Sequence, residues 1–128
     1  MILVDSNIFI AYLRTKEAKL LSLFRTHGGA TCGVVRAEVL QGVKTAAERA
    51  DVRTLFAPLP HVPMPDTLWD EIGDNLALLR RRGITVPFND GVIVTLALAI
   101  DLEVWTHDTH FPLIRTVFPA LRLFVEPP

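Results

Sequence analysis

Short apolar segments alternate with stretches of helical periodicity along the chain, and this alternation limits the possible folds more than any other feature. We expect strands at 2–4, 30–32, 102–106 and 121–125, with a fifth at 59–64 that is weakened by its prolines. The helical patterns lie between them, at 8–13, 16–25, 34–44, 46–56, 66–82, 89–100 and 110–118. Parallel strands need helical crossovers, so this order predicts a three-layer α/β/α fold with a central parallel sheet of about four to five strands.

Length and composition indicate the number of domains and the cellular compartment of the protein. We expect 128 residues to form a single domain over 1–128. No window has the ~18 consecutive apolar residues of a membrane span, and Asp5 interrupts the N-terminal apolar run, so we expect neither a membrane partner nor a signal peptide. The single Cys32 excludes an internal disulfide and is typical of a reducing compartment, which predicts a cytoplasmic protein.

Three acidic residues lie at or near the ends of the predicted strands and helices, and a fourth lies within a predicted helix. Asp5 comes directly after the first strand, and Asp108 comes just after the strand at 102–106. Asp90 opens the helix that leads into that strand, and Glu38 lies at the border of the apolar stripe of its own helix. Ligands of parallel α/β folds bind at the carboxyl ends of the strands. The sequence therefore predicts that the four acids meet at one end of the sheet.

Gathered carboxylates need a counter-charge. Ionised carboxylates repel one another, and a hard divalent cation such as Mg²⁺ prefers oxygen ligands of this kind. A cation bound there can hold a phosphodiester oxygen and lower the pKa of a water molecule. Each acid also has a purely structural interpretation that stays open at this stage: helix capping for Asp5 and Asp90, a helix edge for Glu38, and a turn for Asp108.

Four segments, in order, resemble the motifs of PIN-domain proteins. They are ILVDSNIFI at 2–10, RAEVLQG at 36–42, NDGVIVTLA at 89–97 and WTHDTHF at 105–111. The chain length also resembles that of the bacterial VapC-like toxins. The resemblance implies a PIN-like fold and an Mg²⁺-dependent (or Mn²⁺-dependent) endoribonuclease. It also implies a toxin–antitoxin pair, so that RNA, an antitoxin protein and a second copy of the chain are the expected partners.

The resemblance also implies roles for individual residues. It assigns catalysis and metal binding to Asp5, Glu38, Asp90 and Asp108, and a supporting position around them to Ser6, Asn7 and Thr106. The fourth motif departs from many relatives, which place an acid immediately before its Phe, where this chain has His110. We therefore expect Asp108 to be the fourth ligand and His110 to be a surface residue at a helix start, with metal binding by His110 as the alternative.

Two other functions fit parts of the pattern. A PIN-like module that binds RNA or protein without catalysis would have the same fold, although the presence of all four acids argues against it. A Mg²⁺-binding receiver domain for signalling would need paired acids after the first strand and a late Lys. Asp5 stands alone and no Lys follows Lys44, which disfavours the receiver.

Overall fold

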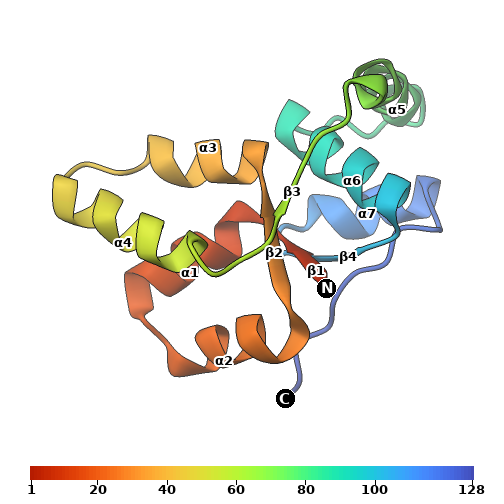
Figure 1. Cartoon of the computed structure of the whole chain (residues 1–128). Coiled ribbons are helices and arrows are strands. Elements are labelled where there is room, and N and C mark those ends of the chain that lie inside the picture. The colour runs from red at the N-terminus through yellow and green to blue at the C-terminus, as the bar shows by residue number, and fades with distance from the viewer.

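A four-stranded parallel sheet forms the centre of the computed structural model, which describes residues 1–128 (Figure 1). The strands lie in the order β3-β2-β1-β4. Their bounds are β1 Ile2–Val4, β2 Gly29–Cys32, β3 His61–Val62 and β4 Glu103–Trp105. Helices flank the sheet, which confirms the three-layer α/β/α prediction.

Seven α-helices connect and cover the strands, and each corresponds to a helix predicted from the sequence. A single 3₁₀ turn at Asp66–Leu68 leads into the fifth helix. The helices are α1 Ser6–Thr15, α2 Ala18–His27, α3 Gly33–Gln41, α4 Ala46–Phe56, α5 Trp69–Arg81, α6 Phe88–Ile100 and α7 His110–Val117. No helix combines the length and the apolar character required to cross a membrane.

Strand β1 is the middle of the core and sets the position of the candidate site. Leu3 pairs with Ala30 of β2 on one side and with Val104 of β4 on the other. All three residues of β1 are buried, as expected for a parallel strand covered on both faces. Because β1 and β4 are parallel neighbours, the residues that follow them, beginning with Asp5 and Thr106, emerge at the same edge of the sheet.

An aromatic cluster holds the first helices against the sheet. The ring of Phe9 in α1 lies 5.3 Å from Phe24 in α2 and 5.0 Å from Phe56 in α4, measured between centroids. Phe24 in turn lies 5.3 Å from Trp105 at the end of β4. Three helices and a strand therefore meet around Phe9, four residues after Asp5.

The strand predicted at 121–125 is absent, so the sheet has four strands rather than five. The backbone of the C-terminal segment pairs with β4 only through an isolated bridge between Val104 and Leu123, with two hydrogen bonds. Val104 N–H donates to Arg122 (2.9 Å), and Phe124 N–H donates to Val104 (2.8 Å). Both hydrogen bonds involve Val104, so the pairing with β4 is limited to this single bridge. Strand β3 exists but has only two residues, because Pro60 and Pro63 border it and cannot donate to a ladder.

Candidate metal centre

Asp5 leaves the buried strand β1 and begins helix α1. Its backbone is extended, and its Oδ1 accepts a hydrogen bond from Ser6 N–H at 2.7 Å. The capping role expected of an Asp before a helix is therefore real. It uses one carboxylate oxygen and leaves Oδ2 to face the end of β4. Asp5 can therefore cap α1 with one oxygen and take part in the candidate site with the other.

Thr106 connects the ends of β1 and β4 through its hydroxyl group. Thr106 Oγ1 donates to Asp5 Oδ2 (2.7 Å) and accepts from Asn7 Nδ2 (3.2 Å) and from Asp108 N–H (3.0 Å). Asn7 Nδ2 also donates to Asp5 Oδ2 (3.3 Å), and Asn7 Oδ1 accepts from His107 N–H (3.2 Å). One hydroxyl and one amide thus hold Asp5 and Asp108, which are 103 positions apart in the sequence, in a common network.

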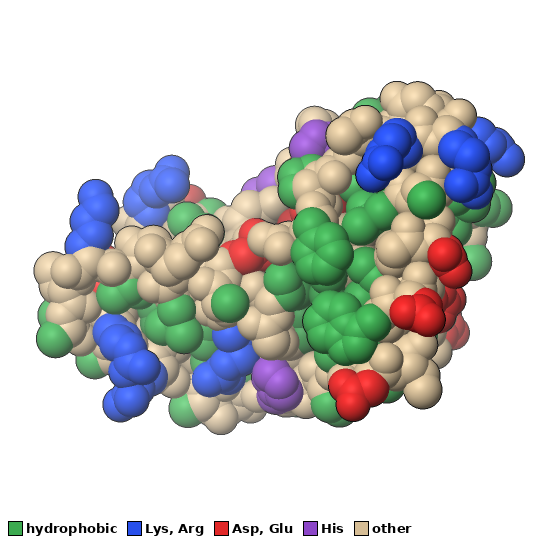
Figure 2. Space-filling view, turned by 90° about the horizontal axis from the view of Figure 1, so that it is seen from above, with side chains coloured by type: hydrophobic (Ala, Val, Ile, Leu, Met, Phe, Trp, Pro, Cys, Tyr) green, Lys and Arg blue, Asp and Glu red, His purple; other side chains and the backbone are tan.

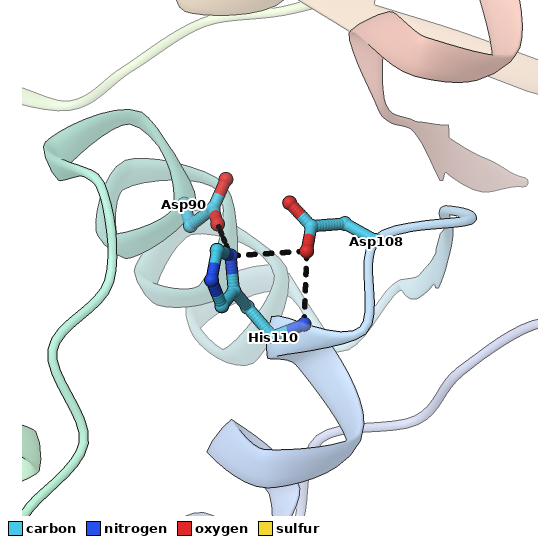
Figure 3. A group of neighbouring side chains, drawn as sticks. All are labelled: Asp90, Asp108 and His110. Carbon is cyan, nitrogen blue, oxygen red and sulfur yellow. Dashed lines mark hydrogen bonds and ion pairs between the residues drawn. The ribbon is translucent and has the colours of Figure 1, made fainter.

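Asp90, Asp108 and His110 form the tightest group of potential ligands (Figure 3). Nδ1 of His110 lies 3.0 Å from Asp108 Oδ1 and 3.3 Å from Asp90 Oδ2. The backbone N–H of His110 also donates to Asp108 Oδ1 at 2.9 Å. His110 begins α7 and its side chain is 40% exposed, as expected for a surface residue at a helix start, but its imidazole also faces both acids.

The interpretation of Asp90 as a helix cap was wrong. Pro87 is the N-cap of α6, and Asp90 is the third residue of the helix, where it is 6% exposed. Proline is tolerated at a helix start because the first N–H groups have no partner within the helix. The side chain of Asp90 is therefore free to point into the group shown in Figure 3.

The electrostatics of the acids connect them into one negatively charged region. Burial, followed by the charges of Asp108 and Asp5, raises the pKa of Asp90 to about 7, against the partial opposition of His110. Burial also raises the pKa of Asp5, and the charge of Asp108 adds to this effect. The pKa of Glu38 is raised by burial and by the charge of Asp5. The pKa values of Asp5, Glu38 and Asp90 are thus each raised in part by the charge of a neighbouring acid. Asp5 and Glu38 nevertheless lie outside the tight group of three.

Polar neighbours favour the ionised forms within this region. The Ser6 hydroxyl lowers the pKa of both Asp5 and Glu38, although less than burial raises it. Asn89 acts in the same direction on the pKa of Glu38. Asn89 is not among the site residues predicted from the sequence, although its position beside Asp90 in the third motif was a signal. Asn89 therefore joins Ser6 as a polar neighbour of the acids.

The chemistry of these residues fits a divalent cation. Glu38 Oε1 is buried and has no hydrogen-bond partner, which is costly for a carboxylate oxygen unless something else binds it. Asp5 and Asp90 are buried acids with raised pKa values, so in the free protein their charge is under-compensated. A hard cation would supply the missing positive charge and accept these oxygen donors.

Removal of the Thr106 hydroxyl should weaken metal binding without removing a carboxylate. In Thr106→Val the side-chain shape is nearly kept, but Asp5 and Asp108 lose their shared hydrogen-bond partner. Loss of such a supporting group costs roughly 10–100-fold in metal affinity. Calorimetric titration with Mn²⁺ measures the effect. Thr116→Val is the matched control, since Thr116 is exposed and bonds only to Leu113 O. Equal affinities in the two variants would contradict a supporting role for Thr106.

The fold and the order of the acidic motifs define a class of protein. The family model for the PIN domain matches residues 2–116, and the chain belongs to this family. Membership removes the receiver-domain alternative. Ribonuclease VapC10 of Mycobacterium tuberculosis is 32% identical over 127 residues, which cover 96% of this chain and 95% of that protein.

Solved structures show the same fold at lower identity. The DNA-bound VapBC of Salmonella typhimurium matches with a TM-score of 0.83 and 22% identity, covering 97% of this chain and 98% of that one. VapBC2 of Rickettsia felis, bound to a DNA fragment from its promoter, matches with a TM-score of 0.80 and 19% identity over the same shares. These matches confirm the predicted PIN-like α/β fold.

Proposed function

We propose that residues 1–128 form a single nuclease domain, an endoribonuclease that hydrolyses RNA phosphodiester bonds with the help of Mg²⁺ or Mn²⁺. The observation that carries the proposal is the region of coupled carboxylates at the end of β1 and β4, in a chain that belongs to the PIN-domain family. The name of the related VapC10 ribonuclease supports RNA as the substrate. Figure 2 shows a small group of acidic side chains near the middle of one face, further acidic side chains along one edge, and Lys and Arg on both sides of the middle group, where they could contact the phosphates of a polyanion.

In this proposal each residue has a chemical task. Asp5, Glu38, Asp90 and Asp108 would hold the cation, while Ser6, Asn7 and Thr106 orient the carboxylates through the contacts described above. When bound, the cation neutralises charge on a phosphodiester oxygen and lowers the pKa of water near it. Cys32 offers no alternative nucleophile, because burial raises the pKa of its thiol and a reactive cysteine needs a lowered one. The four acids are thus the catalytic set.

We further propose that the protein is the toxin of a toxin–antitoxin pair, acts as a homodimer and works in the cytoplasm. The neighbouring structures are VapBC complexes, which supports an antitoxin partner. Large apolar side chains remain uncovered: Trp69 is 50% exposed and Phe88 56% exposed. Both line a groove of about 300 Å³ whose other residues include Met64 and Val92. Burying such a surface against another chain would stabilise an assembly.

A cleavage assay with and without chelator tests the enzymatic proposal. Radiolabelled RNA incubated with the protein and Mg²⁺ should be cut, excess EDTA should stop the reaction, and Mg²⁺ or Mn²⁺ added beyond the EDTA should restore it. Equal cleavage in excess EDTA would contradict a metal-dependent mechanism. RNA binding without cleavage under every metal condition would instead favour the non-catalytic module.

A further inference from the structure

His110 is placed as a metal ligand would be. The distances from its Nδ1 to Asp108 Oδ1 and Asp90 Oδ2 are 3.0 and 3.3 Å. Two donors that occupy adjacent positions of an octahedral ion, each about 2.1 Å from it, lie about 3 Å apart. The ligand atoms of these three residues all lie within 4.8 Å of one another. Nδ1 thus has the spacing to the two carboxylates that a shared ion requires.

The backbone holds the imidazole in this position. His110 is the first residue of α7, and the next residue, Phe111, is fully buried in the core. The N–H of His110 donates to the same Asp108 oxygen that Nδ1 faces, so carboxylate and ring belong to one short turn. No hydrogen bond within the chain engages Nε2, and the side chain is 40% exposed. The ring is therefore oriented by the backbone and the acids and remains reachable from solvent.

We propose that His110 Nδ1 is a direct ligand of the metal centre, together with Asp90 and Asp108, and that this nitrogen makes the centre prefer Mn²⁺ over Mg²⁺. Imidazole nitrogen binds first-row transition metals well, whereas Mg²⁺ strongly favours oxygen ligands. The inference rests on the proposed function in that it concerns the same centre. It adds His110 as a fifth ligand residue to the four proposed acids, and it gives a chemical reason for the centre to bind one cation more tightly than the other.

Pulsed electron paramagnetic resonance of the Mn²⁺-loaded protein tests ligation directly. Electron spin-echo envelope modulation detects nitrogen bound to Mn²⁺, independently of any RNA cleavage. We expect a nitrogen coupling in the wild-type protein, its loss in His110→Ala, and its retention in His61→Ala. His61 is an exposed histidine in β3 that makes no side-chain hydrogen bond, which makes it a matched control. Circular dichroism establishes that each variant is folded.

Affinities for the two cations give a second readout. His110→Ala should lower Mn²⁺ affinity by at least about 10-fold and change Mg²⁺ affinity much less. His110→Glu replaces nitrogen with a carboxylate and should shift the preference toward Mg²⁺. Calorimetric titration of the folded variants with each metal alone measures both changes.

Three results would overturn the inference. The first is bound Mn²⁺ whose nitrogen coupling is the same in His110→Ala as in the wild type. The second is an equal loss of affinity for both metals. The third is tighter Mn²⁺ binding by His110→Ala, which would mean that the imidazole competes with the cation for the acids. RNA cleavage that still depends on metal would leave the proposed function standing in all three cases. Failure of the wild-type protein to bind Mn²⁺ or Mg²⁺ at all would overturn both proposals.

Discussion

Asp90→Asn is expected to reduce RNA cleavage by about 100-fold or more at saturating Mg²⁺. The substitution keeps the size of the side chain but replaces a buried carboxylate with an amide, a much poorer partner for a hard cation. Asp90 is also the most buried of the three residues in the tightest group, so its loss should disturb the centre more than the loss of a supporting hydroxyl, which costs roughly 10–100-fold. Cleavage rates under single-turnover conditions measure the effect.

The same substitution should stabilise the metal-free protein. The pKa of Asp90 is about 7 in the fold and 3.8 as the ordinary value. The folded state therefore binds more protons than the unfolded state between these values, and the free energy of unfolding falls as the pH rises from about 4 to about 7. Asp5 and Glu38 shift in the same direction. At pH 7.5 and without metal, we expect the free energy of unfolding of Asp90→Asn to exceed that of the wild-type protein by on the order of 1–3 kcal/mol, since one pKa unit corresponds to about 1.4 kcal/mol.

An exposed acid provides the control for both effects. Asp74→Asn makes the same chemical change on the outer surface of α5, where the side chain is solvated. It should leave cleavage and the pH dependence of urea unfolding as they are in the wild-type protein. If Asp90→Asn cleaves RNA like Asp74→Asn and is no more stable above pH 7, then Asp90 is a buried structural acid rather than a metal ligand.

Phe9→Ala is expected to lower the free energy of unfolding by about 3–5 kcal/mol, the range for truncating a buried Phe. Phe9 is fully buried, and its ring lies within 5.3 Å of those of Phe24 and Phe56, so truncation opens a cavity where α1, α2 and α4 meet. Urea denaturation followed by circular dichroism measures the loss. Because α1 begins at Ser6, directly after Asp5, loosening of this helix should also weaken Mn²⁺ binding in the folded variant.

The neighbouring residue on the same helix supplies the comparison. Ile10 is 37% exposed, and Ile10→Ala removes a similar kind of side chain from the surface while introducing a better helix former. Its effect on unfolding should stay within about 0.5 kcal/mol, as for surface substitutions. Equal losses for Phe9→Ala and Ile10→Ala would show that the aromatic cluster is not what holds α1 in place.

Local patterns along the chain were enough for most of the architecture. Apolar runs separated by helical periodicity predicted the parallel sheet, and the helix predicted at 46–56 has those bounds in the structure. Asp5 and Asp108 could be placed at strand ends because strand and turn are read from adjacent residues. These features depend on short-range propensity and on the general geometry of parallel sheets, which the amino-acid order determines by itself.

Tertiary structure decided the features that depend on residues distant in sequence. The apolar segment 121–125 resembles a strand, but strand formation needs a partner strand, and Val104 is the only residue of β4 that bonds to its backbone. The burial of Glu38 Oε1 depends on what packs over α3. His110 contacts Asp90, 20 residues earlier, only because α7 begins beside the first turn of α6. Motif order thus predicted the acids on which the proposed site is built, while the packing of separate helices determined that an imidazole lies beside two of them.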